Sequence, residues 1–186
     1  FSVSGSTGNI ITSTFAGSAP IPKVRPDTVK AGGTVTVSAI LSPAQQGVPV
    51  TLFLNTDTSS KPYRGSFPNG DIKITLTTDS KGTVSAKFTV DTVKGSQAFF
   101  RSKVAKPIDG NPAKVLESTD SPAVTTIPGD PAKFVIDLYF TNSEGKLLDP
   151  VGKNVVPGAT IWVNVGISDN YGNPAINPGP SFIQIT

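Results

Sequence analysis

Oxygen-bearing side chains that are able to hold a hard cation gather in two short stretches of the chain. Asp169, Asn170 and Asn173 belong to the run Asp-Asn-Tyr-Gly-Asn-Pro, and Asp130 belongs to the run Pro-Gly-Asp-Pro. Calcium takes about six to eight oxygen ligands, commonly from carboxylates and carbonyls. Asp, Asn, Gly and Pro are also the residues that tight turns favour for backbone reasons. We therefore expect turns and no cofactor, with a calcium site at these four residues as the weaker alternative.

Catalytic chemistry has few side chains to use in this sequence. The chain contains no His and no Cys, so the commonest general base and the thiolate nucleophile are both absent. Its two Glu residues, Glu117 and Glu144, fall in predicted loops, and each Asp lies at a predicted turn or strand end. No Gly-x-Ser-x-Gly elbow or phosphate-binding loop occurs. The sequence therefore predicts a protein that is not an enzyme.

Aromatic side chains are the better candidates for ligand contact. Tyr63 and Phe67 lie in a long irregular segment, residues 55–70, and loops carry binding residues more often than sheets do. Trp162 lies in a predicted strand, on the face opposite Val163. We expect any carbohydrate or protein contact at Tyr63, Phe67 or Trp162, although partial burial in a core or between domains is the favoured interpretation of Trp162.

Composition narrows the class of protein further. Of 186 residues 37% are hydrophobic, enough for a core, but only 16% are charged, below the usual level of about a quarter. The net charge of +3 is spread over scattered Lys residues, so nucleic-acid binding is not expected. No apolar run reaches the length of about 20 residues that a membrane span needs. The absence of Cys and Met, the oxidisable side chains, suits an extracellular protein.

The elements that must position these residues are predicted to be strands throughout. Apolar and polar residues alternate with period two in residues 34–41 and 48–54, and no stretch has helical periodicity. Residues 71–78 and 83–90 flank the turn Asp-Ser-Lys-Gly and are predicted to form a hairpin. Further strands are expected at residues 96–105, 123–127, 132–140, 160–168 and 181–186, with a loop at residues 106–122.

The run Pro-Gly-Asp-Pro at residues 128–131 cannot continue a strand and is predicted to be a domain boundary. Residues 20–128 are then one β-sandwich domain, and residues 129–186 are the start of a second. Residues 1–19, rich in Ser, Thr and Gly with short β-prone pieces, are predicted to close a preceding domain or to donate a strand.

Three turn sequences together resemble those of a known family. They are the run from Asp169 to Pro174 between two strands, the turn Asp79-Ser80-Lys81-Gly82, and the run Pro128-Gly129-Asp130-Pro131. In their order and spacing they resemble the immunoglobulin-like repeats of invasin, intimin and prokaryotic surface-layer proteins. The resemblance covers most of residues 20–186 and implies tandem sandwiches in stalks, lattices or adhesins. The loop Ser42 to Pro49 departs from the family pattern, and residues 55–70 look inserted.

The second sandwich is predicted to be incomplete. Residues 129–186 are too few for a sandwich of about 100 residues, so an apolar face and an open strand edge should remain. One explanation is that the chain is a piece of a longer repeat protein. The other is that a partner supplies the missing strands, for example residues 1–15 of a neighbouring copy.

These expectations define one main function and two alternatives. The main one is a non-catalytic structural module of a prokaryotic cell-surface protein, most readily a surface layer or stalk, whose partners are other copies or domains. One alternative is a self-assembling filament or pilus subunit joined by strand donation from residues 1–15. The other is an adhesin or carbohydrate-binding module.

Overall fold

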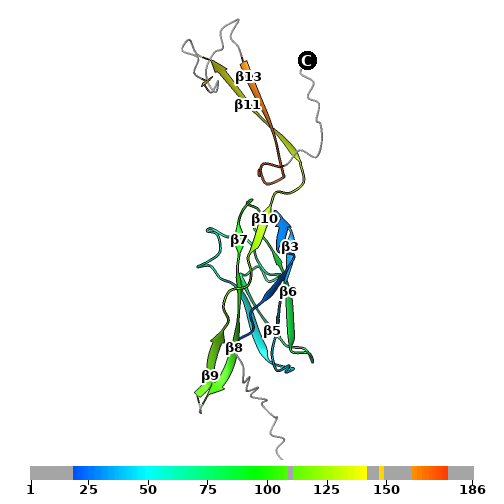
Figure 1. Ribbon diagram of the computed structural model, residues 1–186, viewed down its shortest axis with the longest axis vertical. Helices are drawn as coiled ribbons and strands as arrows, with labels where there is room; N and C mark the ends of the chain where they lie inside the picture. Colours follow the sequence, from blue (N-terminus) through cyan, green and yellow to red (C-terminus); the bar gives the residue numbers. More distant parts are fainter. Residues whose placement is uncertain (1–18, 109–110, 142–146, 149–160, 176–186) are drawn as a thin grey trace, which may run out of the picture.

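The computed structural model describes residues 19–108, 111–141, 147–148 and 161–175, and the part of the chain it describes is all-β (Figure 1). Within those residues no helix is long and apolar enough to cross a membrane. The prediction of an all-β protein is confirmed. The predicted strand at residues 181–186 and the predicted donor segment at residues 1–15 lie outside the described residues.

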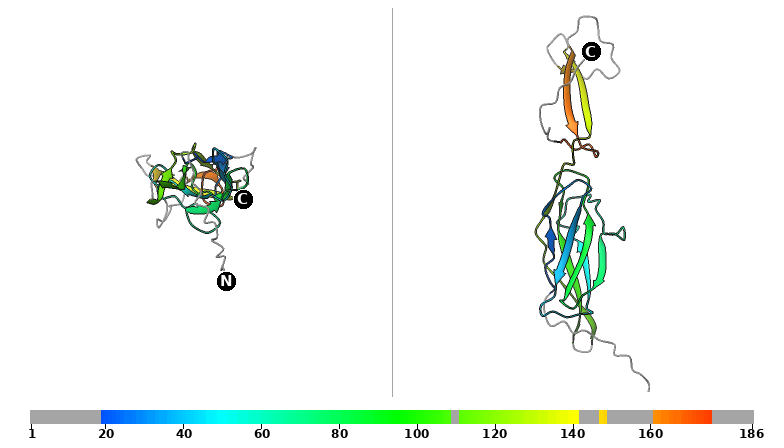
Figure 2. Two further views of the ribbon diagram at one scale, coloured as in Figure 1. Left: turned by 90° about the horizontal axis from the view of Figure 1, so that it is seen from below. Right: turned by 90° about the vertical axis from the view of Figure 1, so that its right-hand side faces the viewer.

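The strands fall into an N-terminal lobe, β1 to β10, and a C-terminal lobe, β11 to β13, placed end to end (Figures 1 and 2). Their bounds are β1 Lys23–Arg25, β2 Thr28–Lys30, β3 Thr34–Ile40, β4 Pro49–Leu54, β5 Lys73–Thr77, β6 Thr83–Thr89, β7 Gln97–Ala98, β8 Phe100–Ile108, β9 Asn111–Glu117, β10 Val124–Ile127, β11 Lys133–Thr141, β12 Leu147–Leu148 and β13 Ile161–Ser168.

The core of the N-terminal lobe lies between sheet β1-β3-β6 and sheet β5-β4-β8-β9. Period-two alternation produces it, because every second residue of β3 and β4 turns inward. The inward residues from these sheets include Val35, Val37, Ala39, Val50, Leu52, Leu54, Val84, Phe88, Phe100 and Val104. Burial of these side chains drives the two sheets together as a sandwich.

Three aromatic rings form the centre of this core. Phe88 packs edge-on against Phe67 and Phe100, with ring centroids 4.9 and 4.8 Å apart. Phe67 is 1% exposed, so it belongs to the core and not to an exposed binding loop. The loop brings it inward because Ser66 forms a bridge with Thr89 of β6.

The predicted hairpin of residues 71–78 with 83–90 is wrong, although both strands exist. β5 pairs with β4 in one sheet, and β6 pairs with β3 in the other. The Asp79–Gly82 turn therefore crosses between the two sheets. Asp79 Oδ1 accepts hydrogen bonds at 2.8 Å from the backbone N–H groups of Lys81 and Thr83, as a tight hairpin turn would also allow.

The predicted loop at residues 106–122 is also wrong over residues 106–108 and 111–117, which form strands. β8 continues to Ile108 and pairs with β9, with a register irregularity between Lys106 and Ile108. β9 is an edge strand in the order β5-β4-β8-β9. An edge strand tolerates Pro112, because proline has no N–H to donate to a neighbouring strand and an edge strand has a neighbour on one side only.

The chain enters the N-terminal lobe through a strand divided between two sheets. β1 pairs antiparallel with β3, and β2 then pairs parallel with β10. β10 in turn pairs with β7, so the order of this sheet is β2-β10-β7. Residues 128–132 follow β10 without strand structure and lead into β11.

The C-terminal lobe is one small sheet in the order β12-β11-β13. β11 and β13 are paired over the full run from Lys133 opposite Ser168 to Phe140 opposite Ile161. β12 meets only the end of β11, at Phe140 and Thr141. In the described residues this sheet has no second layer, in contrast to the sandwich below it (Figure 2).

Candidate functional site

The turn that follows β13 is organised around the carboxylate of Asp169, which is 1% exposed. It accepts hydrogen bonds from the backbone N–H groups of Gly129, Tyr171 and Asn173 and from Asn173 Nδ2, at 2.7 to 2.9 Å. Burial alone would raise the pKa of Asp169. These four donors outweigh burial and hold the pKa at about 2, so the group is ionised at neutral pH.

Asn173 carries this arrangement across to the N-terminal lobe. Its Oδ1 accepts the backbone N–H of Lys94 at 2.8 Å, and its Nδ2 donates to the Thr92 carbonyl at 2.7 Å. Both partners lie in the loop between β6 and β7. The Asp169–Asn173 pair therefore ties the linker, the last turn of the C-terminal lobe and the N-terminal lobe together. We call this set of contacts the junction.

Two further contacts reinforce the junction. A Cβ added to Gly32, which has φ of 69°, would meet the hydroxyl and ring of Tyr171, so the ring lies directly on this glycine. Lys30 of β2 forms an exposed ion pair with Asp130 in the linker. An exposed pair of this kind contributes little, about 0–1 kcal/mol. The hydrogen bonds of Asp169 and Asn173 are the stronger restraint.

The four residues considered for calcium are engaged in these contacts instead. The oxygens of Asp169 and Oδ1 of Asn173 already face N–H donors, which a cation would have to displace. Asp130 pairs with Lys30, and the Asn170 carbonyl accepts from Lys133 Nζ at 3.2 Å. Across the described residues no three or more His, Cys, Asp or Glu side chains cluster in a way that would hold a metal ion. The geometry favours the turn interpretation.

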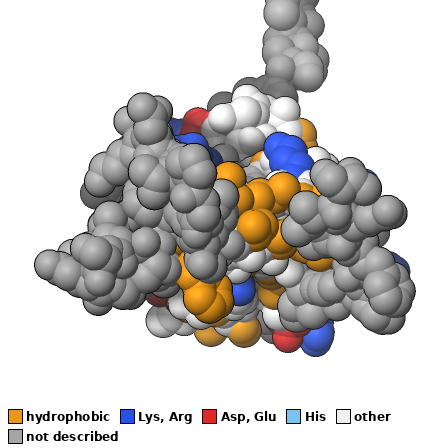
Figure 3. Space-filling model, turned by 90° about the horizontal axis from the view of Figure 1, so that it is seen from above, with side chains coloured by type: hydrophobic (Ala, Val, Ile, Leu, Met, Phe, Trp, Pro, Cys, Tyr) orange, Lys and Arg blue, Asp and Glu red, His pale blue; other side chains and the backbone are white. Residues whose placement is uncertain are grey.

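The C-terminal lobe exposes an apolar sheet face that is continuous across both long strands. Phe134, Ile136 and Leu138 of β11 lie opposite Ile167, Val165 and Val163 of β13. The opposite face of the same sheet is mixed, with Lys133, Asp137 and Asn164 among its residues. Viewed from this end of the molecule, apolar side chains gather in the middle of the surface (Figure 3). We call the first of these two surfaces the apolar face.

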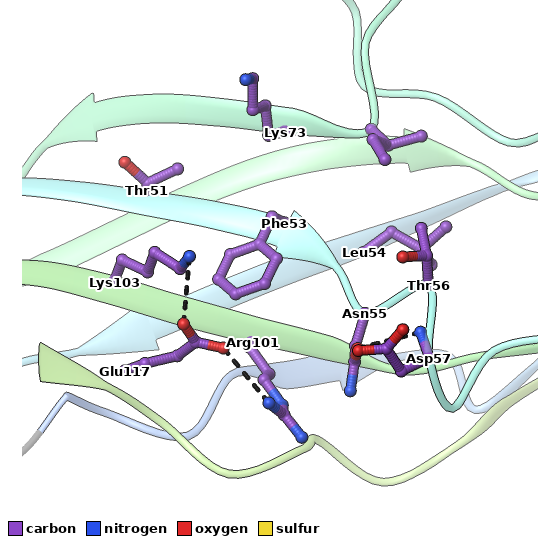
Figure 4. A pocket seen from close by; sticks show the side chains of 11 residues that line it. Thr51, Phe53, Leu54, Asn55, Thr56, Asp57, Lys73, Arg101, Lys103 and Glu117 are labelled. Atoms are coloured by element: carbon purple, nitrogen blue, oxygen red, sulfur yellow. Dashed lines mark hydrogen bonds and ion pairs between the residues drawn. The ribbon is translucent and has the colours of Figure 1, made fainter.

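A surface depression of about 340 Å³ lies on the outer side of sheet β5-β4-β8-β9 (Figure 4). Lys103 Nζ lies 4.8 Å from the centre of the Phe53 ring and 3.0 Å from Glu117 Oε2. Arg101 joins Glu117 at 3.2 Å and Asp120 at 2.7 Å. The volume of the depression is within the usual range for ligand sites, but Arg101, Lys103 and Glu117 in its lining are engaged in ion pairs.

These ion pairs lower the pKa values of the two carboxyl groups, Glu117 and Asp120. Burial alone would raise the pKa of both carboxyl groups. Hydrogen bonds from Lys103 and Arg101 outweigh burial at Glu117 and lower its pKa. Hydrogen bonds from Arg101, Asn55 and Thr58 do the same at Asp120. Sequence reasoning missed this set. The sequence feature that could have indicated this set is the alternation of Leu52, Phe53 and Leu54, which places the Phe53 ring on the outer face of β4.

The three aromatic residues expected to contact ligands are placed in three different settings. Phe67 is buried in the core, as described above. Tyr63 is half-buried against Phe88, and its hydroxyl accepts the Asp91 backbone N–H at 3.4 Å. Burial is the main cause that raises the pKa of Tyr63. Trp162 is exposed on the mixed face of β13, opposite Tyr139 of β11. The structure does not bring these three side chains together.

Comparisons with known proteins add no relative to this description. No protein-family model matches the chain, and no curated protein matches it at a significant level.

Proposed function

We propose that this chain is a non-catalytic structural module of an extracellular cell-surface protein, a stalk or surface layer, built from immunoglobulin-like sandwiches in series. The junction is the observation that carries the proposal. A hydrogen-bonded tie between consecutive lobes is what a protein needs in order to hold its domains in line. Consecutive domains that lack such a tie move relative to one another by default.

The immunoglobulin-like part of the proposal is supported by the strand order. Such folds pack two antiparallel sheets with crossed connections between them. Here β3 and β6 lie in one sheet and β4 and β8 in the other, so the chain crosses between layers at the Asp79–Gly82 turn. The first strand is divided between sheets, since β1 pairs with β3 and β2 pairs parallel with β10 in the separate sheet β2-β10-β7.

The extracellular, prokaryotic part is supported by sequence only. The absence of Cys and Met suits an oxidising exterior, and the turn sequences resemble surface-protein repeats. The test is antibody labelling of intact cells that make the protein, with an antibody raised against the N-terminal lobe. We expect gold particles on unpermeabilised cells. Labelling that requires permeabilisation would overturn the proposal, and an antibody against a cytoplasmic protein is the control.

A self-assembling filament subunit is the second candidate function, and the apolar face is the observation that favours it. A monomer that leaves one whole sheet face apolar has an interaction surface. A filament would still be an extracellular structural protein, so the two candidates differ in how copies are joined. The adhesin alternative gains less support, because Phe67 is buried and the charged groups around Phe53 are paired.

A further inference from the structure

The apolar face is large and regular enough to be one side of an interface. Phe134 is 62% exposed, Ile136 is 59% exposed and Val163 is 44% exposed. They alternate with residues of the mixed face, so exposure of the apolar side follows from the pleat and not from a local irregularity. Soluble monomers rarely leave so continuous an apolar surface in water.

The two edges of the same sheet carry backbone N–H and C=O groups that could pair with a further strand. Among the described residues the outer edge of β13 is met only near its end, by Pro174 opposite Ser168 and by the Ala175 N–H bonded to Ile167 O. On its other side β11 meets β12 only at Phe140 and Thr141. An extended segment satisfies such edges by β-augmentation, which a helix cannot do.

The opposite pole of the molecule is where the chain enters the fold. Ala19 and Ile21 lie beside Ile40, at the end of β3 that is far from the junction. Gly32, just before β3 begins, lies at the junction against Tyr171. Ala19, the first residue that the structure describes, therefore lies at the pole opposite the C-terminal lobe (Figures 1 and 2). Ile21 and Ile40 are also more than half exposed there.

The sequence before this point suits an apolar sheet. Residues 1–19 contain no Asp, Glu, Lys or Arg and no Pro. Ile11 and Phe15 share one side of an extended segment, with Thr12 on the other. Fifteen extended residues span about 50 Å, more than the roughly 30 Å of the nine-residue β11. A charge-free, β-competent segment of sufficient length therefore lies at the correct pole for head-to-tail contact.

We propose that residues 1–15 of a second copy form an added β-strand at the open edge of β13 and turn Ile11 and Phe15 toward the apolar face. Copies are then joined head to tail, because donor and acceptor lie at opposite poles of each chain. An added strand continues the pleated sheet, so Ile11 and Phe15 lie on the same side of it as Val163 and Val165 and extend the apolar face. The inference names a partner for the proposed structural role and rests on it.

The test is complementation between two variants of the full chain, followed by sedimentation velocity. Wild type is expected to form concentration-dependent oligomers that are multiples of 19.2 kDa. Ile11→Asp removes the donor and Ile136→Asp removes the acceptor, so each alone is expected to weaken association at least tenfold. Their mixture retains one intact donor and one intact acceptor, and it is expected to form a dimer of twice 19.2 kDa that grows no further.

Two matched substitutions separate the specific interface from a general effect of added charge. Thr12→Asp neighbours Ile11 but faces the other way, and Val135→Asp neighbours Ile136 on the mixed face of β11. Both are expected to assemble as wild type does. Circular dichroism on every variant tests whether the fold is retained, and Val135 and Ile136 lie outside the N-terminal core.

Three outcomes would overturn the inference. They are a wild type that stays monomeric at all concentrations, an Ile11→Asp chain that assembles normally, and a variant mixture that does not form the dimer. Normal assembly of Ile11→Asp together with loss in Ile136→Asp would identify a second copy of the apolar face as the cover instead. Cell-surface labelling tests the structural role separately, so failure of strand donation and failure of the proposed function are distinguishable.

Discussion

The backbone N–H of Lys94 donates a hydrogen bond of 2.8 Å to Oδ1 of Asn173, across 79 positions of sequence and from one lobe to the other. What the contact does is hold two bodies in one orientation. Four predictions concern the stability of the junction and of the N-terminal core.

Asn173→Ala is expected to loosen the junction. It removes the partners of the Thr92 carbonyl and the Lys94 N–H and one donor to Asp169. Leaving such groups unsatisfied costs about 1–3 kcal/mol where they are buried. Nuclear magnetic relaxation is expected to give separate tumbling rates for the lobes in the variant and one shared rate in wild type. Asn170→Ala, an exposed neighbour in the same turn, is the control and should keep the shared rate.

The junction is expected to weaken in acid. The pKa of Asp169 is about 2 in the folded protein, below the ordinary value near 3.8 that it regains on opening. Its contribution is therefore fully present above pH 4 and is lost as the pH falls from about 4 toward 2. Carbonyl chemical shifts of Asp169 and amide shifts of Gly129 are expected to titrate together in that window. A carboxyl that titrates at its ordinary value would contradict the hydrogen-bonded arrangement.

Gly32→Ala and Gly95→Ala form a matched pair. Both glycines have positive φ, 69° and 82°, so alanine costs about 1 kcal/mol of backbone strain at either position. Only at Gly32 does the added Cβ meet the Tyr171 ring, whereas nothing lies within 4 Å of that atom at Gly95. Gly32→Ala is expected to be the more destabilising in urea unfolding, and the excess should vanish in a Tyr171→Ala background. An equal cost at both glycines would show that Tyr171 exerts no restraint.

Phe67→Ala is expected to lower the free energy of unfolding by about 3–5 kcal/mol, as loss of a buried aromatic ring does. Phe67 is 1% exposed and touches Phe88 and Phe100. Chemical denaturation followed by far-ultraviolet dichroism measures the change. Phe53→Ala on the outer face is the comparison and should cost less. An unchanged free energy of unfolding in Phe67→Ala would contradict the placement of this ring in the core.

Strand positions were predictable from this sequence, whereas strand partners were not. Alternation placed β3, β4, β5 and β6 to within a few residues, because an inward side chain every second position is a local signal. The Asp79–Gly82 turn is compatible with a hairpin and with a crossing between sheets. Which one forms is decided by whether β5 meets β4 or β6, a contact between residues distant in sequence.

The functional residues were identified by type but not by role. Asp169 and Asn173 stood out as oxygen-bearing residues spaced for one turn. The partners of Asn173, which are Thr92 and Lys94, lie about 80 positions away and carry no recognisable pattern. Phe67 was assigned to the surface because residues 55–70 are irregular. Gly65 was the available clue, since any larger residue there would strike the Thr89 carbonyl and the Phe88 ring.

The parallel pairing of β2 with β10 determines how the N-terminal lobe bears mechanical load. Tension applied to the two ends of the chain pulls β2 from its N-terminal end and β10 from its C-terminal end, in opposite directions along neighbouring strands. The hydrogen bonds between residues 28–30 and 125–127 are then strained together in shear, and none can be peeled open before the rest. The lobe is thereby clamped along the axis on which the second lobe is mounted.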